Sequence, residues 1–269
     1  MARLGIYDSG VGGVSILKAI KKLHPNLAIT YLADQQIMPL GEKSREYIRE
    51  RVQKAAQYLF ENDCPLVILA CNTASVVSIR YLQETWIKKT HQGQRNLLGI
   101  NKPLIEFMNQ KYGHLKSKQG MLISTSATYD SGYYQNELVE LGFYHVQAVS
   151  SSDLASAIEA GDCERIDAAV ARAISKLTVT PEEVEFVILA CTHYPFALSQ
   201  IRRFFAPTTA FIEPGPAVAK KLGDYLNRHP EFKLGRGDLR YLTTDAAEVF
   251  AHQLASLTAD EETTEHVKI

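Results

Sequence analysis

Short apolar runs alternate with stretches of helical periodicity along the first half of the chain. The apolar runs are six or seven residues long and predict strands over residues 3–8, 28–34 and 65–71. Apolar residues at helical spacing follow each run and predict helices over residues 12–23, 44–62 and 73–86. Strands that alternate with helices in this way favour a parallel sheet covered by helices on both faces.

The second half of the chain repeats this plan. Strands are predicted over residues 120–128, 145–150 and 185–191, and helices over residues 131–141 and 165–177. Asp8 and Cys71 are 63 positions apart in the first half, and Thr125 and Cys191 are 66 positions apart in the second. The matched spacing indicates an internal duplication.

The predicted fold class is therefore α/β, with two similar parallel-sheet domains related by pseudo-twofold symmetry and the active site in the interdomain cleft. The first domain is expected to comprise residues 1–98 plus 209–269 and to carry Asp8 and Cys71. The second, residues 99–208, is expected to carry Thr128 and Cys191. Only the polar stretch 88–96 and the acidic tail after Thr258 are expected to be loosely structured.

Composition narrows the class of protein. The chain has 269 residues, of which 46% are hydrophobic and 22% charged, as in ordinary soluble domains. A net charge of −1 provides no overall attraction to nucleic acid or to an anionic membrane. The first ten residues lack the apolar core of a signal peptide, and four cysteines are too few for a disulfide scaffold, so we expect a cytoplasmic protein.

Two cysteines carry the strongest chemical signal. The segments VILACNTAS (67–75) and VILACTH (187–193) share five residues in a row, and they place Cys71 and Cys191 120 positions apart. Each cysteine lies where a predicted strand ends and a helix begins, so the helix N-terminus is expected to lower the pKa of its thiol. An isolated cysteine more often packs as a small hydrophobic residue, and we assign that role to Cys64 and Cys163.

Two thiols that face each other across a cleft suggest three chemistries. A zinc site would lack a fourth ligand, because only one histidine accompanies the two cysteines. The cysteines of a redox disulfide usually lie close together in sequence. Proton transfer on opposite faces of one carbon needs two acid–base groups in mirror-related positions, and a duplicated fold provides such a pair.

Polar residues beside the cysteines fit proton transfer. Asp8 would exchange a proton with Cys71, and His193 would do so with Cys191. The alternative role of Asp8 is a helix N-cap, and that of His193 is a buried histidine bonded to a backbone carbonyl. Hydrogen bonds to a carboxylate and an amine would come from Asn72, Thr73, Thr125, Thr128 and Thr192, although such residues at strand ends are mostly caps.

The glycine-rich segment DSGVGGVS (8–15) has a second interpretation. It follows a strand, opens a helix and precedes Asp34 at the end of the next strand, as in a dinucleotide-binding site. Ser15 occupies the place of the third glycine, however, so the signal for nucleotide binding is weak.

Taken together, these segments resemble the aspartate/glutamate racemase superfamily, and most closely glutamate racemase. The resemblance covers nearly the whole chain. It rests on GIYDSGVGG (5–13), YLADQQIMPLGEKS (31–44), ILACNTAS (68–75), STSATYDSGYY (124–134) and ILACTHYPF (188–196), and the two cysteine motifs are the most specific of these.

The resemblance implies a cofactor-independent racemase without a metal, often a homodimer, that supplies D-glutamate for bacterial peptidoglycan. It implies that Cys71 takes the α-proton from the D-enantiomer and Cys191 from the L-enantiomer, with Asp8 and His193 as their acid–base partners. The positions expected to hold the substrate are Ser9, Pro39, Leu40, Gly41, Asn72, Thr73, Thr125, Thr128 and Thr192.

Several positions depart from the family pattern. Leu40 replaces the usual tyrosine of Pro-Tyr-Gly, Ala33 replaces a glycine, and the segment 149–161 lacks a typical Cys-Pro. The segments 96–107 and 212–217 are also unusual. Two alternatives therefore stay open: a racemase or isomerase of the same superfamily that acts on aspartate or another small acid, and a non-catalytic ligand-binding homologue.

Overall fold

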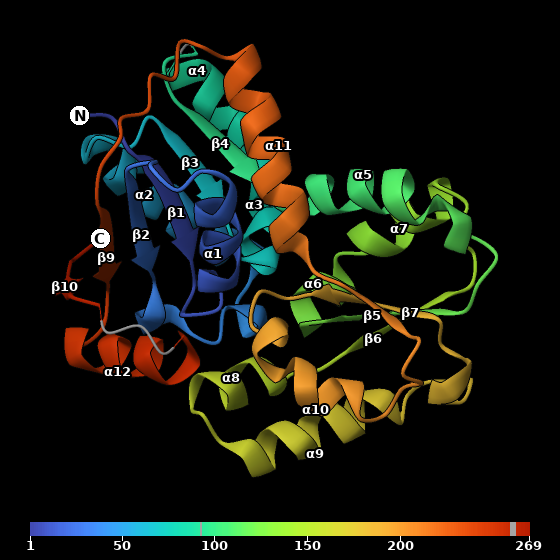
Figure 1. Cartoon of the computed structure of the whole chain (residues 1–269). Coiled ribbons are helices and arrows are strands. Elements are labelled where there is room, and N and C mark those ends of the chain that lie inside the picture. Colours follow the sequence, from blue (N-terminus) through green and yellow to red (C-terminus); the bar gives the residue numbers. More distant parts are fainter. Residues whose placement is uncertain (92, 259–261) are drawn as a thin grey trace.

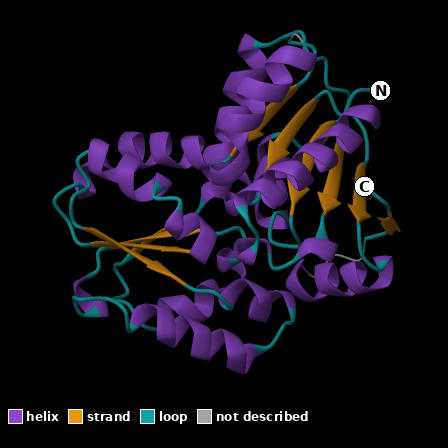
Figure 2. Ribbon diagram, turned by 180° about the vertical axis from the view of Figure 1, so that it is seen from behind, coloured by secondary structure: helices purple, strands orange, loops and turns teal. Residues whose placement is uncertain are grey.

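A computed structural model describes residues 1–91, 93–258 and 262–269 of the chain. Within these residues the strands form two separate parallel sheets (Figures 1 and 2). The spatial order of the larger sheet is β10 (Thr264–His266), β9 (Leu239–Thr243), β2 (Ile29–Ala33), β1 (Leu4–Asp8), β3 (Leu66–Leu69) and β4 (Asn96–Gly99). The order of the smaller sheet is β6 (Val146–Ser150), β5 (Gly120–Ser124), β7 (Phe186–Ala190) and β8 (Ala210–Ile212).

The two sheets repeat one strand order, which confirms the predicted pair of similar α/β units. β2-β1-β3-β4 in the larger sheet corresponds to β6-β5-β7-β8 in the smaller one. We call the larger sheet with its helices the first unit and the smaller sheet with its helices the second unit. Cys71 follows β3 and Cys191 follows β7, so the two thiols occupy equivalent places in the two units.

Helices cover both faces of each sheet, which explains why the strands are continuous apolar runs. Side chains alternate along a strand, so Ile6 and Ile68 enter one core of the first unit and Tyr7 and Leu69 enter the other. In the first unit the covering helices are α1 (Val14–Leu23), α11 (Pro214–Arg228) and α12 (Ala247–Thr258) on one face, and α2 (Arg45–Glu61) and α3 (Asn72–Leu82) on the other.

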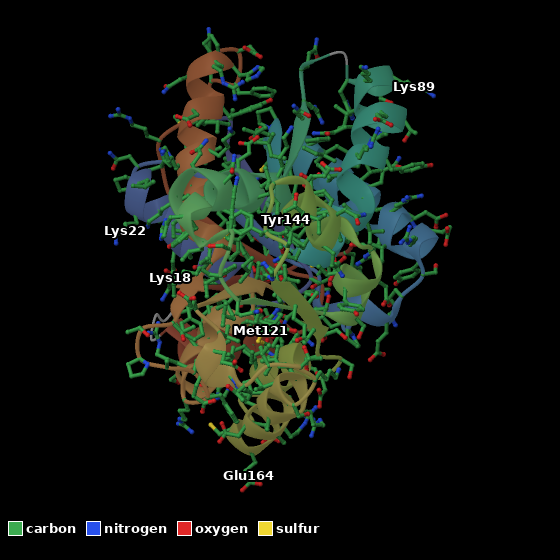
Figure 3. The ribbon with its side chains drawn as sticks, turned by 90° about the vertical axis from the view of Figure 1, so that its right-hand side faces the viewer. Lys18, Lys22, Lys89, Met121, Tyr144 and Glu164 are labelled. Carbon is green, nitrogen blue, oxygen red and sulfur yellow. The ribbon has the colours of Figure 1, made fainter. Side chains whose placement is uncertain are left out.

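The second unit has the same layered arrangement. Its helices are α8 (Leu154–Glu159), α9 (Cys163–Ile174) and α10 (Leu198–Arg202) on one face, and α5 (Asn101–Tyr112) and α7 (Tyr133–Glu140) on the other. Figure 3 shows Met121 of β5 inside this unit, whereas Lys22, Lys89 and Glu164 point outward. None of the helices in the described residues has the length and hydrophobicity that a membrane span requires.

The strand pairing corrects one expected boundary. Residues 210–212, assigned from sequence to the first domain, form β8 and pair with β7 in the second unit. The duplication gives the reason, because β8 is the counterpart of β4. The chain then returns to the first unit, where α11 packs along α1 (Figure 1). The other predicted domain limits remain predictions.

Other local expectations also differ from the structure. The strand predicted over 120–128 ends at Ser124, because Thr125 accepts a hydrogen bond from the backbone of Thr128 and caps the short helix α6 (Ser126–Asp130). The stretch 88–96, expected to be loose, includes α4 (Lys88–Thr90) and the first residue of β4. β10 lies in the tail that was expected to be loose, while residues 92 and 259–261 of the two loose segments lie outside the described residues.

A buried ion pair fixes the loop between β2 and α2, which carries residues 39–41. Asp34 is fully buried, and its two carboxylate oxygens accept hydrogen bonds from Arg51 at 2.6 and 2.8 Å. Thr244 donates to the same carboxylate at 2.9 Å and Tyr7 at 3.2 Å. The start of the loop is thereby tied to α2 and to the end of β9.

We expect Arg51→Ala to lower the free energy of unfolding by about 3 kcal/mol, because it leaves the buried Asp34 carboxylate without its cation. Urea denaturation measures the change. The matched control is Arg80→Ala, which removes an ion pair with Glu84. The side chains of Arg80 and Glu84 are 90% and 61% exposed, so this substitution should lower the free energy of unfolding by at most about 0.5 kcal/mol. Equal effects of the two substitutions would contradict this account of the loop.

Candidate active site

Cys71 and Cys191 line the same cavity between the two units. Cys71 is the N-cap residue of α3, and Cys191 precedes the 3₁₀ turn Tyr194–Ala197. The cysteines are 7% and 5% exposed. Other predicted site residues that line the cavity are Ser9, Pro39, Leu40, Gly41, Asn72, Thr73, Thr125, Thr192 and His193.

The cavity is small. Its volume is about 40 Å³, whereas one water needs about 10–15 Å³ by the same measure, so the cavity holds about three waters. An amino acid is larger than this. Binding of an amino acid therefore requires movement of groups that line the cavity.

Asp8 lies behind the cavity wall, fully buried at the end of β1. Its carboxylate accepts hydrogen bonds from the backbone of Gly10 at 2.9 Å and from the hydroxyl of Thr192, in the second unit, at 3.1 Å. Burial raises the pKa of Asp8 to about 6, although the positive charge of His193 opposes the shift. The alternative role as a helix N-cap is wrong, because Gly13 is the N-cap residue of α1.

Burial dominates the electrostatics of Cys71. The backbone of Ala74 and the hydroxyl of Ser9, 3.6 Å from Sγ, favour the thiolate, as a helix N-terminus should. Burial and the negative charge of Asp8 outweigh them and raise the pKa of Cys71 to about 12. The expectation of a lowered pKa is therefore wrong for this thiol.

Cys191 forms a chain of contacts with a histidine and a carboxylate. Nδ1 of His193 lies 3.8 Å from Sγ of Cys191, and Nε2 lies 2.8 Å from a carboxylate oxygen of Glu159. Burial alone would lower the pKa of His193, but the contacts with Cys191 and Glu159 outweigh it and raise the pKa well above its ordinary value. These contacts favour the imidazolium form, and the partner of the imidazole is a carboxylate, not the backbone carbonyl considered above.

Glu159 was missed by the sequence analysis. It ends the short helix α8, far in sequence from both cysteine motifs, and no neighbouring residue distinguishes it from an ordinary surface glutamate. The only sequence feature that could have indicated Glu159 is its place directly after the apolar positions of a short amphipathic helix, and acidic residues are common at such places. The fold buries its side chain to 8% exposure against His193.

The glycine-rich loop after β1 is a close contact between the units. A side chain at Gly10 would overlap Glu159, and one at Gly12 would overlap the ring of His193. The backbone of Val11 donates to Glu159 at 2.7 Å. Because side chains of the second unit occupy the space in front of these glycines, the loop leaves no room for the pyrophosphate of a dinucleotide.

Hydroxyl and amide groups form the wall on the side of α6. Thr73 lies 3.0 Å from Thr125 and 3.3 Å from Thr128 across the domain boundary, measured between hydroxyl oxygens. Thr128 does not itself line the cavity but supports the two threonines that do. Nδ2 of Asn72 is buried, and none of the described residues accepts a hydrogen bond from it.

The remaining cysteines lie elsewhere. Cys64 packs in the core of the first unit, where burial raises its pKa to about 11. Cys163 is exposed at the start of α9, so the expectation that it packs as a core residue is wrong. In the part of the chain that the structure describes, no group of three or more His, Cys, Asp or Glu side chains is arranged to hold a metal ion.

Comparison with known proteins agrees with this geometry. The chain is 34% identical over 249 residues to a glutamate racemase of Jannaschia sp. (strain CCS1), with 90% of each chain covered. It is 34% identical over 250 residues to a glutamate racemase of Paracoccus denitrificans, covering 90% of this chain and 91% of the relative. No protein-family model matches the chain.

Solved structures give the same result. A glutamate racemase isoform from Bacillus anthracis superposes with a TM-score of 0.85 at 25% identity, covering 100% of this chain and 98% of that one. The fold is also that of the Francisella tularensis glutamate racemase in complex with D-glutamate, with a TM-score of 0.82 at 23% identity and 99% and 97% coverage. On the identity to its relatives over nine-tenths of its length, the chain belongs to the glutamate racemase family.

Proposed function

We propose that this protein interconverts L- and D-glutamate by moving a proton between Cys71 and Cys191 at the α-carbon, without a cofactor. One observation carries the proposal: equivalent cysteines of the two units line one cavity, and each has its own buried ionisable partner. Relatives named glutamate racemase over nine-tenths of the chain support the choice of substrate.

Each turnover conserves one proton. In the direction from D to L, the Cys71 thiolate takes the α-proton, and the carbanion takes a proton from the Cys191 thiol on its opposite face. Asp8 accepts the thiol proton of Cys71 before this transfer, and His193 returns a proton to Cys191 after it. Exchange with water as the product leaves then deprotonates Asp8 and protonates His193, which restores the starting state. The reverse reaction exchanges these roles. Ionised Asp8 and protonated His193 are the starting states that this direction requires. A pKa of about 6 leaves Asp8 mainly ionised at neutral pH, and the raised pKa of His193 favours its protonated form.

The raised pKa of Cys71 implies that the bound substrate itself promotes ionisation of this thiol. A thiol with a pKa of about 12 is not ionised near neutral pH. The ammonium group of a bound amino acid brings a positive charge beside the sulfur, and this favours the thiolate. We infer that Cys71 becomes a base only when an amino acid is bound, which protects the empty site from other reactions of a free thiolate.

The cavity wall supports recognition of a carboxylate. Asn72 begins α3, and its unpartnered Nδ2 lies at the helix N-terminus together with the hydroxyls of Thr73 and Thr125. Such donors stabilise an anion. We assign the second carboxylate of glutamate to the region of Ser9 and residues 39–41, where Leu40 contributes its backbone because its side chain has no hydroxyl.

The cellular role follows from the family. We propose that the enzyme supplies D-glutamate for peptidoglycan, acts in the cytoplasm where L-glutamate is available, and forms a homodimer. The complex of the Francisella relative with D-glutamate supports the product assignment.

Replacing either thiol tests the mechanism. We expect Cys71→Ser and Cys191→Ser each to lower the racemisation rate by about 10²–10⁴-fold, because a serine hydroxyl is a far weaker acid than a thiol. The rate is measured as the loss of the circular dichroism signal of L- or D-glutamate, without added pyridoxal phosphate. In heavy water the product should carry deuterium at the α-carbon. Cys163→Ser, which removes an exposed cysteine outside the cavity, is the matched control and should leave the rate unchanged.

Two results would overturn the proposal in different ways. Faster turnover of aspartate or another small acid than of glutamate would retain the chemistry and replace the substrate. Absence of both racemisation and deuterium exchange with every acid, while glutamate still binds, would indicate a non-catalytic ligand-binding protein.

The rate should depend on the ionisation of Asp8. Its pKa is raised to about 6, so it is mainly ionised above that pH and protonated below it. We expect kcat/KM to fall about tenfold per pH unit below this pKa, because protonated Asp8 no longer accepts a proton from Cys71. Initial rates across this range measure the profile. A kcat/KM that stays constant as pH falls through the pKa of Asp8 would exclude the residue as a proton acceptor.

Gly12→Ala should displace the His193 ring, since the added methyl group would overlap it. A displacement of about 1 Å at a catalytic group costs about 10²-fold in rate, and we expect a loss of that order in kcat. Gly113→Ala is the control, because a methyl group there meets no atom of the described residues within 4 Å and its φ of −56° suits alanine. Equal activity of the two variants would show that a glycine at position 12 is not needed to position the His193 ring.

A further inference from the structure

A tyrosine of the second unit contacts the amide that begins α3. Tyr134 lies on α7, and its hydroxyl donates to Oδ1 of Asn72, in the first unit, at 2.5 Å. Both side chains are removed from solvent, with exposures of 0% for Tyr134 and 2% for Asn72. Of the two residues, only Asn72 lines the cavity.

This hydrogen bond fixes which end of the amide faces the cavity. With Oδ1 taken by Tyr134, Nδ2 points away from α7, and none of the described residues accepts from it. The reverse orientation would place Nδ2 against the phenol oxygen. The phenol proton would then lack an acceptor, because Asn72 is the partner that the structure gives to this hydroxyl. The buried hydroxyl of Tyr134 therefore has an acceptor for its proton only when Oδ1 of Asn72 faces it.

The unpartnered Nδ2 indicates a missing acceptor. A buried donor without a partner is destabilising, and in folded proteins such a group is normally completed by a water, an ion or a ligand. This donor lies at the N-terminus of an 11-residue helix, where a negatively charged acceptor is favoured. A carboxylate oxygen satisfies both conditions.

The geometry points to Tyr134 as a positioning residue: it holds the Asn72 amide so that Nδ2 donates to a carboxylate oxygen of the substrate. This inference rests on the proposed function and adds a residue that does not touch the substrate. Because the tyrosine and the asparagine belong to different units, the donor is correctly oriented only while α7 and α3 are in contact. Carboxylate binding is thereby linked to the relative position of the two units.

Tyr134→Phe is the first test. Loss of the hydroxyl frees the amide to rotate, so substrate and transition state lose the same hydrogen bond. We expect KM for both enantiomers of glutamate to rise about tenfold, with kcat within about twofold of wild type. A merely structural role would lower the melting temperature or the active fraction and leave KM unchanged. Tyr133→Phe is the matched control, since Tyr133 is the adjacent tyrosine, is only half-buried, and has Asn101 and not Asn72 as its side-chain hydrogen-bond partner.

A double-mutant cycle tests whether Tyr134 acts through Asn72. Asn72→Ala should raise KM at least as much as Tyr134→Phe does, and adding Tyr134→Phe to it should change KM by less than about twofold. If the fold-change in KM of the double variant equals the product of the two single fold-changes, the two residues act independently and the inference is overturned.

Asn72→Asp keeps the inference testable if the tyrosine variant does not fold. The aspartate still accepts from Tyr134 but presents a negatively charged oxygen where Nδ2 stood, so KM should rise above that of Asn72→Ala. Retention of the wild-type KM would mean that an oxygen already faces the cavity, and the inference would fail.

Failure of the proposed function gives a different result. If the wild type does not racemise glutamate, calorimetric titration with D-glutamate replaces KM as the readout for the same variants. Weaker binding by Tyr134→Phe would then support the positioning role although the activity is absent. An unchanged affinity or unchanged KM in a folded Tyr134→Phe variant would overturn the positioning role whether or not the wild type is active.

Discussion

Burial of ionisable side chains between the two units determines the electrostatics of this site. Asp8, Cys71 and His193 are at most 7% exposed, so their charges depend mainly on their nearest partners and not on solvent. Burial raises the pKa of Asp8 to about 6, and burial together with the negative charge of Asp8 raises the pKa of Cys71 to about 12. Contacts with Cys191 and Glu159 favour the charged form of His193.

The duplicated scaffold supports an asymmetric site. Cys71 and Cys191 follow equivalent strands, but their partners are not equivalent. Asp8 ends β1, and the corresponding strand β5 ends at Ser124, which is not ionisable. The second thiol instead has His193 from its own loop and Glu159 from α8. Symmetry of the backbone thus brings two thiols to one cavity, while local side chains place a carboxylate near one thiol and an imidazole beside the other.

Many polar contacts of the site join the two units. Thr192 donates to Asp8, the backbone of Val11 donates to Glu159, and Tyr134 donates to Asn72. The hydroxyl of Ser15 also donates to the carbonyl oxygen of Thr192 at 2.9 Å. The shape of the cavity therefore depends on how the two units are placed relative to one another.

The sequence by itself determined the alternation of strands and helices, the duplication and the two cysteines. These features are encoded locally: buried parallel strands need continuous apolar runs, and a repeated VILAC segment can be seen without a fold. The loop from Ser9 to Gly13 was also visible, but its role was not, because the residues that need its glycines lie some 150 to 180 positions later in the chain.

Only the tertiary structure decided which residues contact the site residues and which strand pairs with β8. Glu159 has no local signal, since an acidic residue at a helix end is usually solvated, and only the packing of α8 against the loop after β1 buries it on His193. The placement of β8 in the second unit depends on pairing with β7, a contact that local sequence does not encode. The pKa of Cys71 followed the same rule: the helix N-terminus predicted from sequence is present, but burial, a property of the whole fold, has the larger effect.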